Sequence, residues 1–275
     1  MRALQELDLE TLSRCVAVFT DIDDTLTTDG QLPAAAYAAL ERLAEAGLEV
    51  VPITGRPAGW CDMIARLWPV AGIVGENGAF YFSYDRQARV MRQRFFATDE
   101  ERRSNRARLN TLRERILREV PGAGIASDQL YREADLAIDF CEDVKPLPPS
   151  DVDRILALFA EAGAVAKVSS IHVNGWFGDY DKLSMTRIFA RDVLGLDIDA
   201  MRDRVIFVGD SPNDGPMFGF FPNSCGVANV RAFAPGSFNP PAFVAEAEGG
   251  EGFVEVADRI LQAQSGADRR KVAHG

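Results

Sequence analysis

Short apolar runs alternate with helix-like patterns in the first part of the chain. The runs at residues 16–19, 48–53 and 72–74 predict buried strands, and residues 33–46 and 59–67 repeat apolar positions with helical spacing. This alternation is typical of a mainly parallel sheet that carries helices on both faces. We therefore expect an α/β fold that begins as a doubly wound, Rossmann-like core.

The pattern changes after residue 79. Two apolar segments around a polar turn, at 80–84 and 89–96, predict a hairpin. The segments that follow predict helices at 99–120 and after Pro149, and strands at 136–140 and 168–173. This mixture is typical of a separate α+β layer.

The parallel pattern returns with a helix at Lys182 and a strand at 204–208, and a helix at 252–263 closes the core. The irregular segment 233–241 is expected to connect two core strands. The predicted parts are a first core segment at 1–79, an inserted α+β cap at 80–179, a second core segment at 180–264 and a polar, disordered tail at 265–275.

Acidic residues stand where the first predicted strand ends. Asp21 and Asp23 follow the run 16–19 two positions apart, so both can turn towards one cation. Active sites of open α/β sheets lie beyond the carboxyl ends of the strands, which makes this a candidate site. A calcium loop is excluded because Leu26 stands where its turn needs Gly and Leu32 where it needs Glu. A polar turn that caps a helix remains the structural alternative.

Three further clusters lie at strand ends or helix starts. Residues 54–56 follow the second strand and form a turn that is able to bind phosphate. Lys182 begins a helix, so its ammonium lies near the positive end of the helix dipole. Asp210 and Asp214 follow the strand at 204–208 and complete a set of oxygen donors for a hard cation.

Taken together, these four segments resemble the motifs of the haloacid dehalogenase superfamily. Residues 21–25 look like its first motif, Thr54 like the second, Lys182 like the third and residues 209–214 like the fourth. Residues 75–79 look like the junction from which cap-bearing members of the class IIB branch depart. Within that branch the chain is similar to sugar phosphatases that act on sucrose phosphate, trehalose phosphate and mannosyl-phosphoglycerate, and to phosphomannomutases.

The resemblance implies a phosphatase that works through an aspartyl-phosphate intermediate. Asp21 would be the nucleophile and Asp23 the general acid and base, which argues for phosphoryl chemistry because dehalogenating relatives need no acid there. Thr54 and Lys182 would bind the transferring group. A carboxylate that attacks an anionic phosphate from about 4 Å meets roughly 4 kcal/mol of repulsion at an effective dielectric near 20, which a metal and a lysine offset.

The resemblance also implies a resident Mg²⁺ ion, which all-oxygen ligands favour. The side chains of Asp21 and Asp210 and the backbone carbonyl of Asp23 would hold the ion. Asp214 would ligate it directly or hold the metal shell.

Substrate contacts are expected from both sides of the cleft. His172 and Asn174 share one face of a strand that returns to the core, and Trp176 is a candidate for stacking on a sugar. Alternatively, His172 is an ordinary hydrogen-bonded strand residue and Trp176 packs the hinge; the sequence leaves both open. Asn213 is expected to orient Lys182 or a carboxylate. The complete set of expected substrate contacts is Thr54, Gly55, Arg56, Asn77, Lys182, Asn213, His172 and Asn174.

Composition narrows the function classes. The 275 residues carry a formal net charge of -11, which argues against non-specific binding to nucleic acid or anionic membranes. We expect a cytoplasmic protein, because no run approaches the ~20 apolar residues of a membrane span and no apolar signal-peptide centre follows Met1. Four dispersed cysteines indicate reduced thiols. The arginine-rich run at 102–118 also carries glutamates, so we expect an ion-paired face of a cap helix, with one or two arginines facing a charged substrate.

The sequence therefore predicts a Mg²⁺-dependent phosphatase of a small phosphomonoester, first of all a sugar phosphate. One alternative is a phosphosugar mutase, which retains the phosphoryl group and needs a bisphosphorylated activator. Another is a non-catalytic phosphate-binding module, which would have lost a catalytic position. The sequence indicates neither the leaving group nor the oligomeric state.

Overall fold

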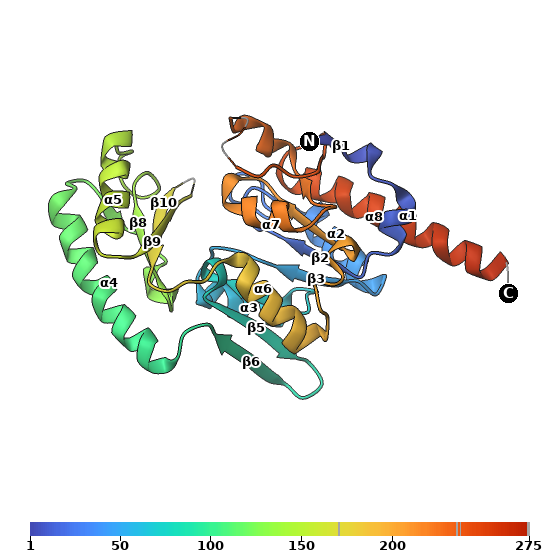
Figure 1. Cartoon of the computed structure of the whole chain (residues 1–275), viewed down its shortest axis with the longest axis horizontal. Coiled ribbons are helices and arrows are strands. Elements are labelled where there is room, and N and C mark those ends of the chain that lie inside the picture. Colours follow the sequence, from blue (N-terminus) through green and yellow to red (C-terminus); the bar gives the residue numbers. More distant parts are fainter. Residues whose placement is uncertain (170, 235, 237, 274–275) are drawn as a thin grey trace.

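The computed structural model describes residues 1–169, 171–234, 236 and 238–273. A core and a smaller cap lie side by side (Figure 1). The core sheet has the strand order β1-β13-β12-β11-β2-β3, and each neighbouring pair is parallel. Its strands are β1 (Arg2–Ala3), β2 (Ala17–Thr20), β3 (Glu49–Pro52), β11 (Val205–Gly209), β12 (Cys225–Gly226) and β13 (Phe243–Val244). The predicted α/β fold with a parallel core is confirmed.

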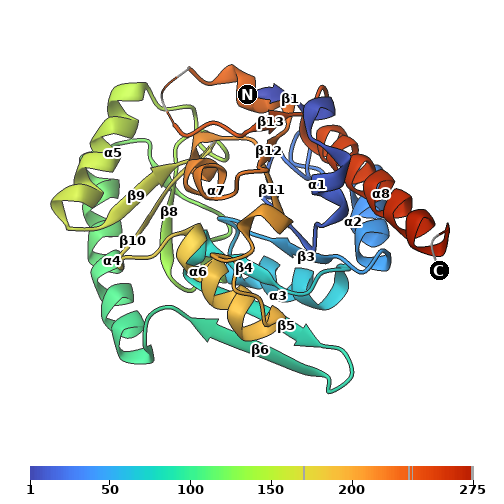
Figure 2. The ribbon, with the colours of Figure 1, turned by 45° about the vertical axis from the view of Figure 1, so that its right-hand side comes forward.

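Helices cover both faces of this sheet (Figure 2). One face carries α1 (Leu9–Ser13), α2 (Ala34–Glu45), α3 (Ala58–Leu67) and α8 (Gly249–Ala273), and the other carries α6 (Lys182–Phe189) and α7 (Gly215–Phe220). Side chains alternate between the faces along each strand, so Val18 packs with the first group and Phe19 with the second. Shorter helical turns lie at Leu4–Glu6, Glu76–Gly78, Gln129–Tyr131, Ala190–Leu194, Arg202–Arg204, Pro212–Asp214 and Ala228–Ala232.

The predicted hairpin belongs to the core and not to the cap. Strands β5 (Phe80–Asp85) and β6 (Val90–Phe95) form an antiparallel sheet with β4 (Ile73–Gly75). A bridge between Ile53 and Val74 attaches this sheet to the end of β3. The cap boundary predicted at residue 80 is therefore wrong, because the apolar face of the hairpin is buried in the core cluster.

The cap begins at α4 (Asp99–Glu119) and has a sheet of order β7-β8-β10-β9. Its other elements are β7 (Gly124–Ile125), β8 (Asp135–Asp139), α5 (Pro149–Glu161), β9 (Val165–Val168) and β10 (His172–Trp176). The single strand predicted at 168–173 is wrong, since Val168 ends β9 and His172 begins β10. Residue 170 lies outside the described residues.

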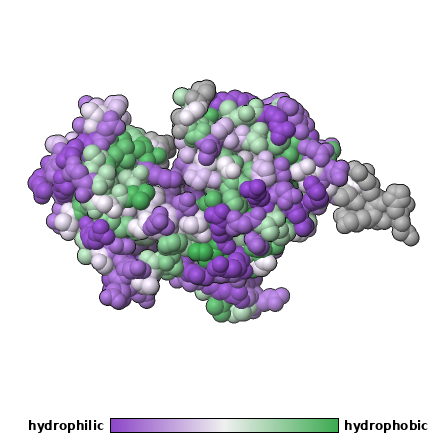
Figure 3. All heavy atoms as spheres, viewed as in Figure 1, coloured by the Kyte–Doolittle hydropathy of each residue, from purple (hydrophilic) through white to green (hydrophobic). Residues whose placement is uncertain are grey.

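The cap sheet has one apolar and one polar face. Leu136, Ile138 and Val173 pack against α4 and α5, whereas the intervening residues face the core. The outer edge of the cap, over α4, is hydrophilic (Figure 3). As expected, arginines of α4 pair with carboxylates there, for example Arg115 with Glu119 at 2.8 Å.

The chain ends differ from expectation. Helix α8 continues to Ala273, so the tail predicted to be disordered from residue 265 is helical as far as the structure describes it. His274 and residue 275 lie outside the described residues. The irregular segment 233–241, apart from residues 235 and 237, lies between β12 and β13 as predicted. Across the described chain, no helix combines the length and the apolar character needed to span a membrane.

Candidate active site

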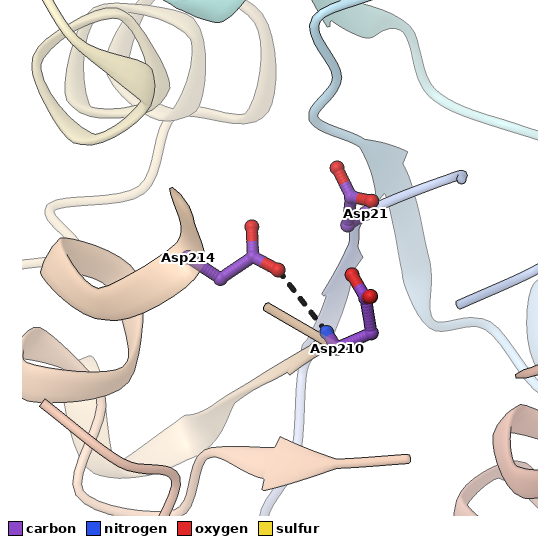
Figure 4. A group of neighbouring side chains, drawn as sticks. All are labelled: Asp21, Asp210 and Asp214. Atoms are coloured by element: carbon purple, nitrogen blue, oxygen red, sulfur yellow. Dashed lines mark hydrogen bonds between the residues drawn. The ribbon is translucent and has the colours of Figure 1, made fainter. Parts of the chain in front are cut away.

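Two adjacent parallel strands bring the acidic clusters together. Strands β2 and β11 pair with Thr20 opposite Val208, and the backbone N–H of Asp21 donates to the carbonyl of Val208 at 2.9 Å. Asp21 and Asp210 each follow one of these strands, so they leave the same edge of the sheet. With Asp214, their carboxylate oxygens lie within 4.8 Å of one another, and all three residues are buried (Figure 4).

Lys182 joins this cluster from the start of α6. Its Nζ donates to Oδ1 of Asp21 and to Oδ1 of Asp214, each at 2.7 Å, and the residue is only 4% exposed. The helix begins here because the Asp181 side chain accepts a hydrogen bond from the Ser184 N–H at 2.7 Å. Burial alone would lower the pKa of Lys182. The carboxylates of Asp21 and Asp214 outweigh this effect and raise the pKa above its ordinary value, so the ammonium stays charged.

The donor set fits a divalent cation. Burial raises the pKa of Asp210 to about 7, with a further contribution from Asp214, and burial also raises the pKa of Asp21 against the opposing effect of Lys182. One ammonium thus faces three carboxylates, and within the described chain the Asp210 carboxylate has no hydrogen bond or ion pair of its own. A cation bound by oxygens would balance this charge.

Asp214 has a supporting position in the cluster. Its Oδ2 accepts the backbone N–H of Asp210 at 3.1 Å (Figure 4), and its Oδ1 accepts Lys182. It therefore orients both the lysine and the turn that carries Asp210. The prediction that Asn213 orients Lys182 or a carboxylate is wrong for this structure, because Asn213 Nδ2 instead donates to Asn77 Oδ1 at 3.3 Å.

Asp23 lies at the mouth of the cluster and is paired with Arg56. The Arg56 Nε donates to Asp23 Oδ1 at 2.8 Å, while the Asp23 side chain remains 36% exposed. The guanidinium also lies over the ring of Trp60, 4.4 Å from its centroid. Arg56 therefore holds the Asp23 carboxylate beside the cleft and lines that cleft itself.

The remaining core residues close one end of the cleft. Thr54 is fully buried, and its hydroxyl accepts the Arg56 backbone N–H at 3.0 Å; it does not line the cavity. Asn77 lines the cavity, and its backbone lies in the left-handed region at φ 57°. A Cβ on Gly55 would come within 3.2 Å of Asn77, so the small residue allows the two turns to meet. The Oδ1 of Asn213 is buried without a hydrogen-bond partner in the described chain.

The polar face of the cap sheet forms the opposite wall of a cavity of about 450 Å³. His172 and Asn174 line it as predicted, and the sequence did not identify Lys167, which stands opposite Asn174 in the β9–β10 register. Asn174 donates to Asp135 at 3.1 Å. His172 Nε2 lies 2.8 Å from a Glu142 oxygen. Strand alternation would have flagged Lys167 once the register was known.

Trp176 has the hinge role that the sequence left open. The residue is 1% exposed, stacks on Tyr180 with 5.7 Å between ring centroids, and does not line the cavity. Arg132 is a second residue that the sequence did not identify. It is buried in an irregular loop, where no periodicity marks it, and its Nη1 donates to the Gly55 carbonyl at 3.3 Å and to Asp135 at 3.1 Å.

Glu76, in the junction turn, fastens the cap to the core. Its fully buried carboxylate accepts the backbone N–H groups of Glu133, Ala134 and Asp135 in the cap at 2.6 to 3.1 Å, and that of Ala58 in α3 at 3.0 Å. Burial and Asp135 raise the pKa of Glu76, and the N–H groups counter this because they favour the charged form.

The chain resembles known proteins in sequence and in fold. Residues 18–104, which include Asp21, Asp23 and Thr54, match the family model of haloacid dehalogenase-like hydrolases. None of the curated proteins matches the chain. A structure from Thermoplasma acidophilum is 19% identical, with a TM-score of 0.67, over 90% of this chain and 98% of the other.

Two further solved structures have the same fold. The sucrose-phosphatase of Synechocystis, solved with sucrose and phosphate, is 14% identical with a TM-score of 0.61, over 89% of this chain and 97% of that chain. A trehalose-6-phosphate phosphatase related protein is 14% identical with a TM-score of 0.59, over 92% and 99%. The match of residues 18–104, the parallel core and the aspartate cluster at its edge together make the chain similar to the haloacid dehalogenase-like hydrolases.

Proposed function

We propose that this hydrolase is a Mg²⁺-dependent phosphatase that cleaves a small phosphomonoester, first of all a sugar phosphate. The observation that carries the proposal is the contact of Lys182 with Asp21 in a buried carboxylate cluster, with Asp23 beside it at the mouth of the cleft. This arrangement offers a nucleophile, a fixed positive charge and a separate acid. Its cytoplasmic location stays a prediction.

In the first half-reaction, an oxygen of Asp21 forms a bond to phosphorus while the bond to the leaving oxygen breaks. Asp23 donates its proton to that leaving oxygen. Lys182 holds Oδ1 of Asp21 and carries the positive charge that stabilises the transferring oxygens. The product alcohol departs and the phosphoryl group remains on Asp21.

In the second half-reaction, Asp23 takes a proton from water as the water attacks phosphorus. The bond between phosphorus and Asp21 breaks, which releases inorganic phosphate and restores the carboxylate. Arg56 keeps Asp23 at the cleft for both steps through its hydrogen bonds. The thirty-six per cent exposure of the Asp23 side chain is consistent with proton exchange with solvent between the steps.

A Mg²⁺ ion would be held by the carboxylates of Asp21 and Asp210 and by the backbone carbonyl of Asp23, with Asp214 supporting the site. When bound, the ion supplies positive charge that offsets the repulsion between the nucleophile and the substrate phosphate. The unbalanced charge of the three carboxylates supports this assignment.

A polar leaving group is supported by the cap wall of the cleft. Lys167, His172 and Asn174 offer hydrogen-bonding groups to a cavity of about 450 Å³. Two proteins of the same fold are named as a sucrose-phosphatase and a trehalose-6-phosphate phosphatase related protein. A hydroxyl-rich sugar phosphate is the substrate class that suits both observations.

The direct test is phosphate release from a panel of phosphomonoesters, with Mg²⁺ or with a chelator, and with Asp21→Asn as the background. We expect release that requires both Mg²⁺ and Asp21, with a sugar phosphate ranked above simple alkyl phosphates. Isomerisation of a phosphosugar without phosphate release would identify a mutase instead. No reaction with any compound would contradict the phosphatase proposal.

A further inference from the structure

A second cavity, which we call the hinge cavity, lies between the cap and the core. It has a volume of about 200 Å³ and is lined by α4, by residues between 129 and 136 that lead into β8, and by residues of both linkers between cap and core. The first linker contributes Ala97, between β6 and α4, and the second contributes Phe177 and Tyr180, between β10 and α6 (Figure 1). A ligand that fills this cavity would lie against both linkers.

The lining of the hinge cavity is cationic. Among the described residues, its wall holds four arginines and two carboxylates, which are Arg102, Arg106, Arg113, Arg132, Glu133 and Asp135. Arg132 is also paired with Asp128 and Arg102 with Asp99, so the positive charge that is open to a ligand comes mainly from Arg113 and Arg106. Arg102 and Arg106 share Glu133, at 2.9 and 3.3 Å. Arg113 forms no ion pair with any described residue. The cavity is therefore complementary to an anion.

Two buried hydrogen-bond donors of this wall lack acceptors. Within the described chain, the Tyr180 hydroxyl and the Arg102 Nε are buried without a hydrogen-bond partner. Tyr180 is only 7% exposed, and burial raises the pKa of its hydroxyl well above the ordinary value, so the proton is retained. A buried donor without an acceptor costs free energy. Both residues line the hinge cavity, so a small movement of either side chain would bring its donor to the oxygen atoms of an anionic ligand.

The other wall is aromatic and offers a surface for a carbon skeleton. Phe95 lies under the Arg102 guanidinium, with 3.5 Å from Cζ to the ring centroid. Phe177 and Tyr180 line the cavity beside it. A small organic anion fits this combination of arginines and rings better than a bare inorganic ion does.

The hinge cavity is coupled to the active-site cleft through one residue. Arg132 lines both cavities, and its Nη1 donates to Asp135 on one side and to the Gly55 carbonyl on the other. A ligand beside Arg132 would add negative charge at this wall and would bridge α4 to the linkers. Its contacts would differ between cap positions, which is the requirement for coupling between two sites.

We propose that the hinge cavity is a second ligand site, which binds a small organic anion, and that its occupation changes the affinity of the active-site cleft for substrate. The anionic group is a carboxylate or a phosphorus oxyanion, since both offer the acceptors that the two donors lack. Binding at the hinge cavity does not depend on the phosphatase activity proposed above.

The test is calorimetric titration of the full chain with succinate and, separately, with methylphosphonate. Arg113→Gln removes a cavity arginine that has no ion pair to lose, and Tyr180→Phe removes only the unpartnered hydroxyl. Arg118→Gln is the matched control, because it makes the same change at an exposed position of α4 outside the cavity. The probe that binds more tightly identifies the anionic group.

We expect the wild type and Arg118→Gln to bind one probe with the same Kd, Arg113→Gln to bind it at least tenfold more weakly, and Tyr180→Phe to fall between them. Equal binding by all four proteins would place the anion elsewhere, for example in the active-site cleft, and would overturn the proposal. Absence of saturable binding to the wild type would show a cavity that holds only solvent, which also overturns it.

The coupling is measured as the KM for a phosphomonoester substrate with and without the saturating probe. We expect KM to shift at least twofold in the wild type and in Arg118→Gln, with no shift in Arg113→Gln. An unchanged KM in the wild type would overturn the coupling even where binding is observed. Because the titration needs no turnover, failure of the phosphatase proposal would be seen separately as absence of phosphate release.

Discussion

The core wall and the cap wall of the active-site cleft are built differently. On the core wall, charged groups are buried and form hydrogen-bonded ion pairs: Lys182 donates hydrogen bonds to both Asp21 and Asp214. On the cap wall, polar side chains stand on one face of a sheet and contact other cap residues, as Asn174 does with Asp135. The difference teaches that the core is organised for a charge-dependent reaction, while the cap offers a surface whose side chains can differ without disturbing that reaction.

The comparison predicts that core substitutions change turnover and cap substitutions change affinity. Removal of the nucleophile should have the largest effect. Asp21→Asn should lower kcat by at least about a thousandfold, because the amide does not form the covalent intermediate. The fold should persist, since the change relieves repulsion among buried carboxylates. Steady-state kinetics and thermal unfolding measure both; substantial remaining turnover would contradict the assignment of Asp21.

Lys182→Met should have the next largest effect. It removes the ammonium from the carboxylate cluster, so we expect a loss of about a hundredfold or more in kcat and, without added metal, about 3–5 kcal/mol in the free energy of unfolding. Denaturant unfolding and kinetics measure these effects. The double variant Lys182→Met, Asp214→Asn should recover part of the stability but none of the turnover. A stable, active Lys182→Met protein would disprove the role of the lysine.

Glu76→Gln tests the attachment between the two walls. Its amide N–H₂ would face backbone N–H groups that now donate to a carboxylate, so about 2–4 kcal/mol of stability should be lost. Hydrogen exchange at Glu133 to Asp135 should accelerate. Glu133→Gln is the control, because it makes the same change in the same loop and keeps the Glu76 contacts. It loses the pairs with Arg102 and Arg106, but the Glu133 side chain is 42% exposed, so this loss should cost little stability. Equal stability and exchange in both variants would show that Glu76 does not fasten the cap.

The metal should bind more weakly as the pH falls. Burial raises the pKa of Asp210 to about 7 in the metal-free protein, so below that pH a proton competes with the cation for the carboxylate. Mg²⁺ affinity, measured by calorimetry, should therefore rise with pH up to about 7 and then level off. An affinity independent of pH from about two units below that pKa to about one unit above it would argue against Asp210 as a ligand.

Lys167→Met should have the smallest effect. It removes the ammonium from the cap wall and leaves the core cluster intact, so KM should rise severalfold for the best substrate while kcat changes by less than about twofold. Lys145→Met, at an exposed cap position away from the cleft, is the matched control. A fall in kcat with unchanged KM would place Lys167 among the groups that act on the transferring phosphoryl.

The same comparison explains what the sequence could predict. The core residues Asp21, Thr54, Lys182 and Asp210 follow apolar strands or begin a helix, and parallel strands bring their carboxyl ends together whatever the details of packing. The pattern of the hairpin predicts antiparallel pairing between its two strands, but it does not indicate that the first of them also pairs with β4 of the core.

Cap contacts depend on register and on loop geometry, which local patterns do not encode. The position of Lys167 at the cleft follows only from its pairing with Asn174, which the sequence does not indicate. Arg132 lies in a loop without periodicity. The sequence marks Glu76 only as part of a junction, because its four hydrogen bonds from backbone N–H groups join segments far apart in the sequence. Such contacts are properties of the folded chain.

The most direct test of the central claim is to trap the intermediate. Asp23→Asn should still allow attack on an activated phosphomonoester with a good leaving group, but it should hydrolyse the phosphoenzyme slowly, because the base for water is missing. Mass spectrometry after rapid quenching is expected to find the phosphoryl group on the peptide that contains Asp21. Turnover with no phosphoryl group on the protein, or with the group on another residue, would contradict the account.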